Sequence, residues 1–159
     1  MASKSYSHLE LDKLDRQILS ILMKNATKPY TEIAKELIVS GGTIHVRMKK
    51  MEEMGIIRGA NLIVDPQKLG YDVCAFIGIF LEKGTHYNTA VGFLDKIPEV
   101  VEVHYTTGAY SIFAKVICRD TAHLREVLNE KIQEIQGVQR TETLISMEES
   151  IRRQITLDQ

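Results

Sequence analysis

The sequence predicts an α+β protein of two domains, an N-terminal helix-turn-helix (winged-helix-like) domain and a C-terminal ferredoxin-like domain. Apolar residues recur at helical spacing in the first third of the chain, which is typical of short amphipathic helices. After residue 71, β-prone runs alternate with two helical stripes in the order β-α-β-β-α-β. We expect a helix-turn-helix domain over residues 11–64, a linker over 65–70 and a second domain over 71–152. The ends, 1–10 and 153–159, are predicted to be a disordered N-terminus and a C-terminal tail.

The first two helices are predicted on either side of a proline. The first runs from Leu11 to Asn25, with Asp12 as its N-cap and Asp15 placed three residues later, as in a capping box. The segment Lys28–Tyr30 breaks this helix because it contains Pro29. We expect Thr31 to cap the second helix, which ends before a short Gly-containing turn at Val39–Gly42.

The third helix begins after Ser40, whose hydroxyl is expected to cap it. Its inward stripe is Ile44, Met48 and Met51, at positions i, i+4 and i+7. Gly55 is expected to end it, because a glycine easily adopts the left-handed conformation at a helix C-terminus. The opposite face is basic, hydroxylated and partly apolar.

Such a face suits the major groove of DNA, where cations contact phosphates and small polar or methyl groups contact base edges. Lys49 and Lys50 are expected to reach phosphates, and the side chains between Thr43 and Val46 to report base identity. Arg47 lies nearer the buried stripe, so an ion pair with a neighbouring helix and a phosphate contact both remain open. A solvated face of an ordinary helical bundle is the alternative. The candidate DNA-binding residues are Ser40, Thr43, His45, Val46, Arg47, Lys49 and Lys50.

The connection and the second domain are predicted from β-prone runs. Ile56–Ile57 and Leu62–Val64 indicate a linking strand before the Asp65-Pro66 turn. Four further strands are expected at Asp72–Leu81, Val100–Thr106, Tyr110–Cys118 and Val138–Met147. The first of these is predicted to be buried on both faces, and the second to place Val101, Val103 and Tyr105 on one face. Helices around residues 90–97 and 124–135, ended by Pro98 and Gly137, would cover one sheet face and leave the other for a second subunit.

Charge and composition narrow the class of protein. The net charge of −1 conceals an asymmetry of +3 through Ala60 and −4 in the remainder, so positive charge accompanies the third helix. The longest apolar run, Val73 to Leu81, is about half as long as a membrane span, and no signal sequence opens the chain. We expect a cytoplasmic protein without a membrane partner. Cys74 and Cys118 lie in apolar runs, which favours buried free thiols over a disulfide or a metal site.

Several segments in this order resemble the Lrp/AsnC family of prokaryotic transcription regulators, and more closely its AsnC branch. The resemblance covers about residues 11–151 and rests on Gly42–Arg47, Leu69–Val73, Phe76–Ile79, Tyr105–Gly108, Tyr110–Phe113 and Thr141–Ile145. It departs from the family at Gly41, where a proline often follows the capping serine. The resemblance implies a DNA-binding domain joined to a ligand-responsive one, dimers that assemble into octamer-like rings, and an amino acid, for this branch asparagine, bound between dimers.

In light of this resemblance, the turn from Tyr105 to Ser111 is the candidate effector site. Gly108 admits a small ligand and presents N–H groups to a carboxylate, while hydroxyl and phenol groups surround it. Gln139 can exchange two hydrogen bonds with a carboxamide. An ordinary tight hairpin with paired hydroxyls is the alternative. The candidate effector-binding residues are Tyr105, Thr107, Gly108, Tyr110, Ser111, Gln139, Thr141 and Thr143.

Two other functions compete with a DNA-binding regulator. Siroheme decarboxylases resemble this family and would make the chain an enzyme, and an amino-acid-sensing partner without DNA binding is also conceivable. His104 is the only histidine on a predicted strand of the second domain, and no acid–base pair or metal spacing accompanies it. We therefore expect no catalytic residues, no metal and no cofactor beyond the amino-acid effector. The basic third helix argues against loss of DNA binding.

Overall fold

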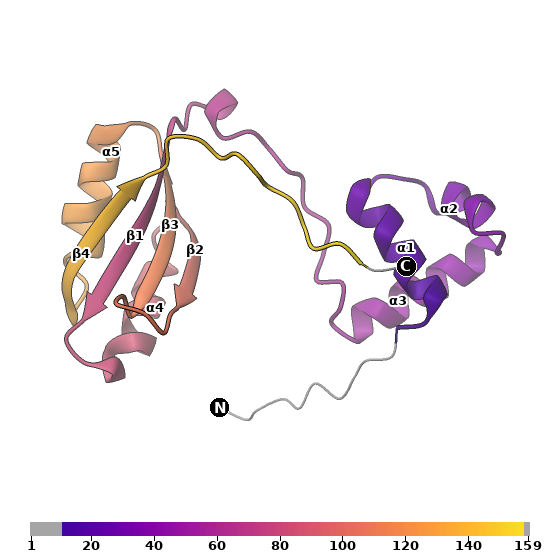
Figure 1. The fold of residues 1–159 in the computed structure, drawn as a ribbon, viewed down its shortest axis with the longest axis horizontal. Helices are drawn as coiled ribbons and strands as arrows, with labels where there is room; N and C mark the ends of the chain where they lie inside the picture. Colours follow the sequence, from indigo (N-terminus) through magenta and orange to yellow (C-terminus); the bar gives the residue numbers. More distant parts are fainter. Residues whose placement is uncertain (1–10, 158–159) are drawn as a thin grey trace. The chain divides into compact units, whose positions relative to one another are not determined.

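The computed structural model describes residues 11–157, so the predicted disordered segment 1–10 lies outside the described part of the chain. The chain divides into two compact units (Figure 1). The first contains the residues up to Ile63 together with the C-terminal residues from Arg152, and the second contains Val64–Ile151. The C-terminal residues therefore belong with the N-terminal unit rather than with the strand that precedes them.

The N-terminal unit is a bundle of three helices, as predicted. The helices are α1 (Lys13–Lys24), α2 (Tyr30–Glu36) and α3 (Gly41–Glu53). The capping box of α1 is present, because the N–H of Asp15 donates to Asp12 Oδ1 at 2.9 Å and the N–H of Asp12 donates back to Asp15 Oδ2 at 3.3 Å. Gly55, with φ of 71°, follows the end of α3 as expected.

The core of this unit takes its side chains from the predicted stripes. Ile44, Met48 and Met51 of α3 are buried against Ile18 of α1 and Ile33 of α2. Each buried aliphatic side chain of this size stabilises the fold by about 1.5–3 kcal/mol relative to an exposed one. The spacing of apolar residues thus fixes which face of α3 turns inward and which face remains available.

Two predictions about the turns of this unit are wrong. Thr31 does not cap α2, because the helix begins one residue earlier, at Tyr30, with Pro29 in the N-cap position and no side-chain cap. The turn before α3 does not use a glycine either. Its left-handed residue is Ile38, with φ of 56°, and Gly41 already lies inside α3.

The predicted linking strand is also absent from the described residues. Residues 56–66 form neither helix nor strand, and the apolar side chains of Leu62–Val64 are exposed. A β-prone segment becomes a strand only when a partner accepts its backbone hydrogen bonds. Within residues 11–157, no strand pairs with this segment.

The second unit has the predicted β-α-β-β-α-β order, which makes the protein α+β. Its four-stranded antiparallel sheet has the strand order β2-β3-β1-β4 (Figure 1). The elements are β1 (Val73–Leu81), α4 (Tyr87–Leu94), β2 (Val100–Tyr105), β3 (Ile112–Cys118), α5 (Thr121–Glu126), a π-helical continuation (Val127–Ile132) and β4 (Val138–Ile145). Gly137, with φ of 91°, lies between the second helix and β4, near the predicted helix end.

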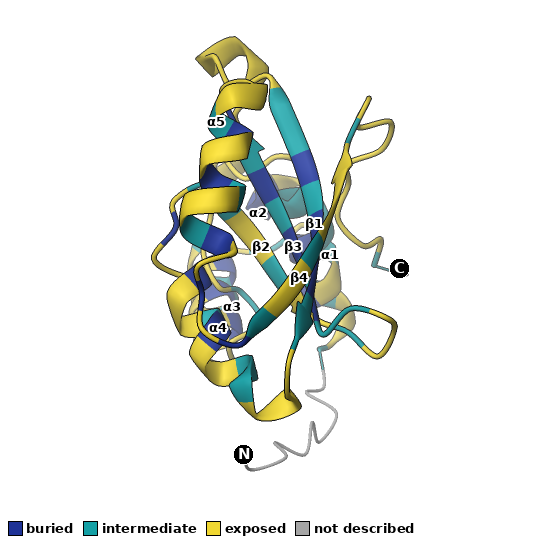
Figure 2. Cartoon of the chain, turned by 90° about the vertical axis from the view of Figure 1, so that its left-hand side faces the viewer, coloured by how far each residue is buried: buried dark blue, intermediate teal, exposed yellow. Residues whose placement is uncertain are grey.

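Only one face of the sheet is buried within the chain. Ala75, Ile77 and Ile79 of β1 lie beneath the helices in the core, whereas Phe76 and Phe80 on the other face are only half-buried (Figure 2). The prediction that β1 is buried on both faces is therefore wrong for the single chain. A β-bulge overturns another prediction on this sheet. The bulge between Val100 and Glu102 leaves Val101 exposed rather than on the core face with Val103.

Among the described helices, none is long and apolar enough to cross a membrane. This finding agrees with the short apolar runs of the sequence.

Replacement of Ile38 by glycine is expected to stabilise the N-terminal unit by about 0.5–1 kcal/mol. The left-handed conformation costs a β-branched residue about 1–2 kcal/mol, and glycine removes this cost. Part of the gain is offset because glycine has more conformational entropy in the unfolded chain. Little packing is lost, because the Ile38 side chain is 92% exposed. Native-state hydrogen exchange of the amides in α1–α3 measures the change. Val46→Gly, at an exposed position inside α3, is the control and should destabilise by about 1 kcal/mol. A loss of stability in Ile38→Gly would contradict the argument.

Candidate nucleic-acid interface and effector site

The N-terminus of α3 is organised by two hydroxyls. Ser40 Oγ accepts a hydrogen bond from the N–H of Thr43 at 3.1 Å and lies 2.8 Å from Thr43 Oγ1. The predicted cap is therefore confirmed, even though Gly41 occupies the first helical position. Ser40 is exposed and Thr43 is half-buried, and the pair keeps one O–H free to donate outward.

The outward face of α3 presents Val46 and Lys49. Val46 is 68% exposed, and the Lys49 side chain is 77% exposed with only a 3.8 Å contact to Glu53 on the next turn. An exposed pair of this kind contributes little, so Lys49 is free to leave it. His45 lies beside them and packs edge-on against the ring of Tyr30 at 4.8 Å. The first residue of α2 thus orients His45, a role that nothing in the spacing of the sequence indicated.

The remaining cations of α3 point toward α1 instead. Arg47 Nη1 pairs with both carboxylates of the capping box, contacting Asp12 and lying 3.2 Å from Asp15 Oδ1. Lys50 Nζ lies 3.6 Å from the other oxygen of Asp15, which is fully buried. Of the two possibilities left open for Arg47, the structure shows the ion pair. Lys50, expected at a phosphate, has a structural partner as well.

This network has an electrostatic signature at Asp12. The hydrogen bond from the N–H of Asp15, followed by that from Arg47, holds the pKa of Asp12 below its ordinary value. A buried carboxylate such as Asp15 is tolerated only when it is paired and hydrogen-bonded. The ion pairs therefore fix α3 against α1 and determine the direction in which its outer face points.

The predicted effector turn is closed by Thr106, which sequence reasoning passed over. Its hydroxyl donates to the carbonyl of Tyr110 at 2.5 Å, and its N–H donates to the carbonyl of Ser111. The N–H of Ser111 is bound to the carbonyl of Ile79 at 3.0 Å. In the described part of the chain, the N–H groups of Thr107 and Gly108 at the tip have no backbone acceptor, so they remain available to a ligand.

The structure divides the predicted effector residues between the two faces of the sheet. Thr143 and Thr141 of β4 pair in register with Ile77 and Ile79 of β1, so they lie on the helix-covered face, where Thr141 accepts a hydrogen bond from Gln133. Gln139 lies beside the bulge at Phe80/Leu81, where the simple alternation ends.

Tyr110 lies on the opposite, open face. Its ring covers Gly78 so closely that a Cβ at that position would overlap it, and it packs edge-on against Phe80 at 5.1 Å. Its hydroxyl donates to Glu142 Oε2 at 2.8 Å, and Arg140 pairs with the same carboxylate. The hydrogen bond to Glu142 raises the pKa of Tyr110, and the hydrogen bonds from Arg140 and then Tyr110 lower the pKa of Glu142. Within one chain, Tyr110 therefore does not converge with Thr141 and Thr143.

Tyr105 forms a separate contact. It is largely exposed and packs against Tyr87 of α4, with the ring centroids 4.5 Å apart. Tyr87 is half-buried and packs against the core of this unit, whereas Tyr105 at the end of the edge strand β2 is exposed beside the turn. Tyr105 pairs in register with buried Ile112, so it lies at the edge of the helix-covered face.

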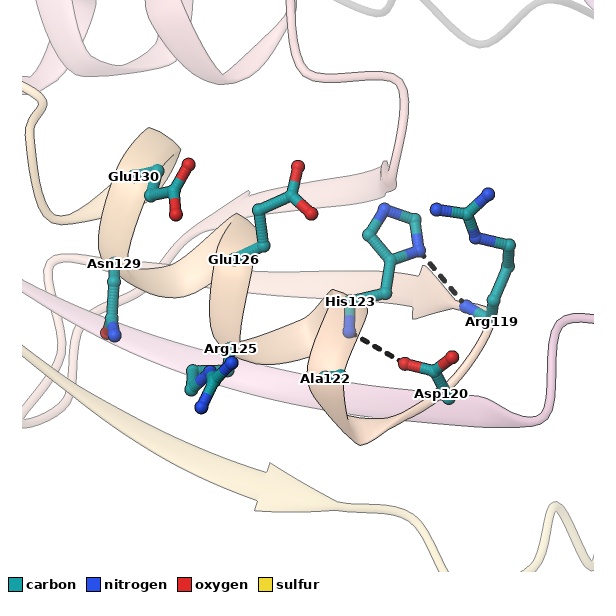
Figure 3. A pocket seen from close by; sticks show the side chains of 8 residues that line it. All are labelled: Arg119, Asp120, Ala122, His123, Arg125, Glu126, Asn129 and Glu130. Carbon is teal, nitrogen blue, oxygen red and sulfur yellow. Dashed lines mark hydrogen bonds between the residues drawn. The ribbon is translucent and has the colours of Figure 1, made fainter.

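A surface pocket of about 430 Å³ lies along α5, away from the predicted residues (Figure 3). Its lining mixes charges of both signs and contains none of the effector candidates. His123 at its edge accepts the N–H of Arg119 at Nδ1, and its Nε2 lies 3.0 Å from Glu99, which Lys131 also contacts. Burial would raise the pKa of Glu99, but the hydrogen bonds from Lys131 and His123 lower it. The histidine is thus held by structural partners on both ring nitrogens. The lining residues are Arg119, Asp120, Ala122, His123, Arg125, Glu126, Asn129 and Glu130.

Both halves of the chain match known protein families. Residues 11–58 match a winged helix-turn-helix DNA-binding model, and residues 74–155 match the Lrp/AsnC ligand binding domain. The regulatory protein AsnC of Haemophilus influenzae is 52% identical over 145 residues, covering 91% of this chain and 97% of its own length. AsnC of Escherichia coli is also 52% identical, with 95% of its length covered. The structure of E. coli AsnC superposes with a TM-score of 0.89 at 50% identity, covering 93% of this chain and 99% of that one.

Arg47→Met is expected to lower the free energy of unfolding of the N-terminal unit by about 2 kcal/mol, because buried Asp15 then keeps the hydrogen bond from the N–H of Asp12 but, of its two ion pairs, only the longer one with Lys50. Lys49→Met, which breaks an exposed pair, is the matched control and should change it by less than about 0.5 kcal/mol. Hydrogen exchange of α1–α3 distinguishes the two, and equal effects would refute the structural role.

The same variant has a pH signature. The lowered pKa of Asp12 contributes stability that is present above the unfolded value of 3.8 and is lost as pH falls through the folded value. At neutral pH, the loss of the Arg47 contact with Asp12 therefore lowers the free energy of unfolding by its full amount. We expect the gap to wild type to narrow below about pH 4.

Proposed function

The chain belongs to the Lrp/AsnC family of transcription regulators, and from this premise we propose how its residues divide the work and that its effector is L-asparagine. The protein is a DNA-binding transcription regulator that responds to an amino acid, and not an enzyme. The observation that supports this assignment of residues is the exposed face of α3, where the side chains of Val46 and Lys49 do not contribute to the packing of the helices. We assign DNA binding to residues 11–64, and ligand binding and oligomerisation to 71–152.

The DNA interface follows from the direction of the α3 side chains. Lys49 contacts a phosphate, while Thr43, His45 and Val46 reach base edges, with the valine methyl groups suited to thymine. The Ser40 hydroxyl, which caps α3, donates outward to a phosphate of the DNA at the N-terminus of the helix. Arg47 and Lys50 act mainly by fixing α3 against Asp15, although Lys50 is exposed enough to add a second phosphate contact.

Charge separation between the two units supports this assignment. The N-terminal unit with its C-terminal residues holds 12 Lys and Arg against 8 Asp and Glu, a balance of +4. The second unit holds 8 against 13, a balance of −5. Positive charge thus accumulates where phosphates are to be bound, while the ligand unit is repelled by DNA.

The effector site is built around the tip of the turn. The free N–H groups of Thr107 and Gly108 bind the asparagine carboxylate, with the hydroxyls of Thr107 and Ser111 as further donors. Gln139 meets the carboxamide, and Tyr105 supplies the wall. Because Tyr110 and the threonines of β4 lie on different faces, one chain does not gather the whole set. This supports a site completed by a neighbouring copy.

The open face of the sheet supports the assembly. Phe76, Phe80, Tyr110 and Phe113 form an aromatic strip there, and Leu144 on β4 is half-exposed. We propose that two copies pair through this face, and that such dimers, working in the cytoplasm, associate into an octamer with asparagine between them. The pairing covers apolar side chains that the chain leaves open.

Lys49→Ala is expected to weaken binding to duplex DNA from the protein's own promoter region, and to do so equally for all sequences. Loss of one phosphate contact lowers the slope of log affinity against log salt by about 1. Lys83→Ala, an exposed lysine of the ligand unit, is the control. Fluorescence anisotropy over a salt series gives both slopes. An unchanged slope for Lys49→Ala would remove this residue from the interface.

Gly108→Asp is expected to weaken asparagine binding by about tenfold or more, because a carboxylate at the tip repels the ligand's own carboxylate. Gly84→Asp is the matched control. A Cβ at either glycine meets no atom within 4 Å, so both variants should fold. Isothermal titration calorimetry compares them. Equal affinities in the two variants would exclude the turn as the effector site.

A further inference from the structure

We propose that residues 146–157, which we call the C-terminal strap, form a second connection that couples the ligand unit to the DNA-binding unit, with Leu157 as its positioning residue. This inference rests on the proposed function. The chain passes between the two units twice, once near residue 63 and again near residue 151. The second passage returns the chain to the helical bundle after the last strand.

The beginning of the strap is fixed to the sheet. The N–H of Ser146 donates to the carbonyl of Cys74 on β1 at 2.8 Å, one residue beyond the end of β4. Glu149 then lies 3.4 Å from Lys115 on β3, a lysine whose side chain is mostly buried over the ring of Phe76. The strap therefore leaves the ligand unit from a point held by two neighbouring strands.

The end of the strap is docked on the helical bundle. Leu157 is half-buried and packs against the apolar cluster that contains Ile44, Met48 and Met51 of α3. Ile155, two residues earlier in the same extended segment, is 78% exposed. Residues 148–157 form no helix or strand, so burial of Leu157 reflects a specific contact rather than the pattern of a regular element.

With two connections, the DNA-binding unit is attached to the rest of the chain at two points, which leaves it less freedom to reorient than a single linker would. The first connection leaves α3 through Gly55 and Gly59, both in the left-handed region of φ, followed by exposed residues without regular structure. Such a segment by itself permits reorientation. A short second tether keeps Leu157 at a high effective concentration near its docking site, so even a small apolar contact remains formed.

The strap is linked to the candidate effector site through β4, although it begins at the other end of β1: Ser146 is bound to Cys74, whereas Ser111 of the turn is bound to Ile79. It continues directly from β4, where Glu142 binds the hydroxyl of Tyr110. A ligand at the turn that shifts Tyr110 therefore acts on the strand that leads to Leu157. Such a coupling requires that the ligand bind the two positions of β4 with different affinity.

The test uses the full chain with three variants: Leu157→Ala, the rescue variant Leu157→Met, and the matched control Ile155→Ala. Hydrogen exchange of α1–α3 reports docking, calorimetry with L-asparagine reports effector binding, and anisotropy with a promoter duplex reports the change in DNA affinity caused by asparagine. We expect Leu157→Ala to exchange faster in α1–α3 and to lose at least half of the asparagine-dependent change, with asparagine affinity within twofold of wild type. The rescue and control variants should behave like wild type.

Any other result would contradict one part of the proposal. Equal exchange in Leu157→Ala and Ile155→Ala would show that the strap is not docked. Faster exchange with a wild-type response to asparagine would make Leu157 a packing residue without a coupling role. If the wild-type chain does not respond to asparagine, the proposed effector is wrong and the coupling fails with it, while the exchange data still decide whether the strap is docked.

Discussion

A four-stranded sheet whose helices cover only one face leaves an apolar surface that the chain cannot bury alone. Ile77 and Ile79 are enclosed beneath the helices, while Phe76, Phe80 and Phe113 on the other face remain half-exposed. The same division separates Tyr110 from Thr141 and Thr143. The self-association and the shared ligand site that we propose would both follow from this one-sided coverage.

The N-terminal unit faces a different constraint, the charge of Asp15 in its core. Two cations of α3 turn inward to neutralise it, which leaves the outer face with fewer basic residues than its sequence suggests. In the DNA interface that we propose, recognition depends on the remaining side chains of this face, whose direction the ion pairs hold. A buried ion pair of this kind contributes more to geometry than to stability.

Sequence periodicity predicted the three N-terminal helices, the β-α-β-β-α-β order of the second unit and the inward stripe of α3, because these depend on the spacing of apolar residues. It failed where the local structure is determined by backbone geometry or by the presence of a partner strand. Ile38 adopts a conformation usually left to glycine, Leu62–Val64 lacks a partner strand, and the bulges in β2 and β4 interrupt the alternation. For the candidate site, the residue types of the turn were predictable, but the role of Thr106 and the separation of Tyr110 from the β4 threonines required the register of the sheet.

The close packing of Tyr110 on Gly78 has a consequence for sequence variation. The phenol ring of Tyr110 occupies the volume that a side chain at position 78 of β1 would fill, so only one of the two positions can carry a large side chain. A larger residue at 78 is compatible with the fold only alongside a smaller one at 110, which would also release Glu142 from the tyrosine hydroxyl. Steric complementarity across two strands thus ties the identity of a turn residue to that of a sheet residue 32 positions away in sequence.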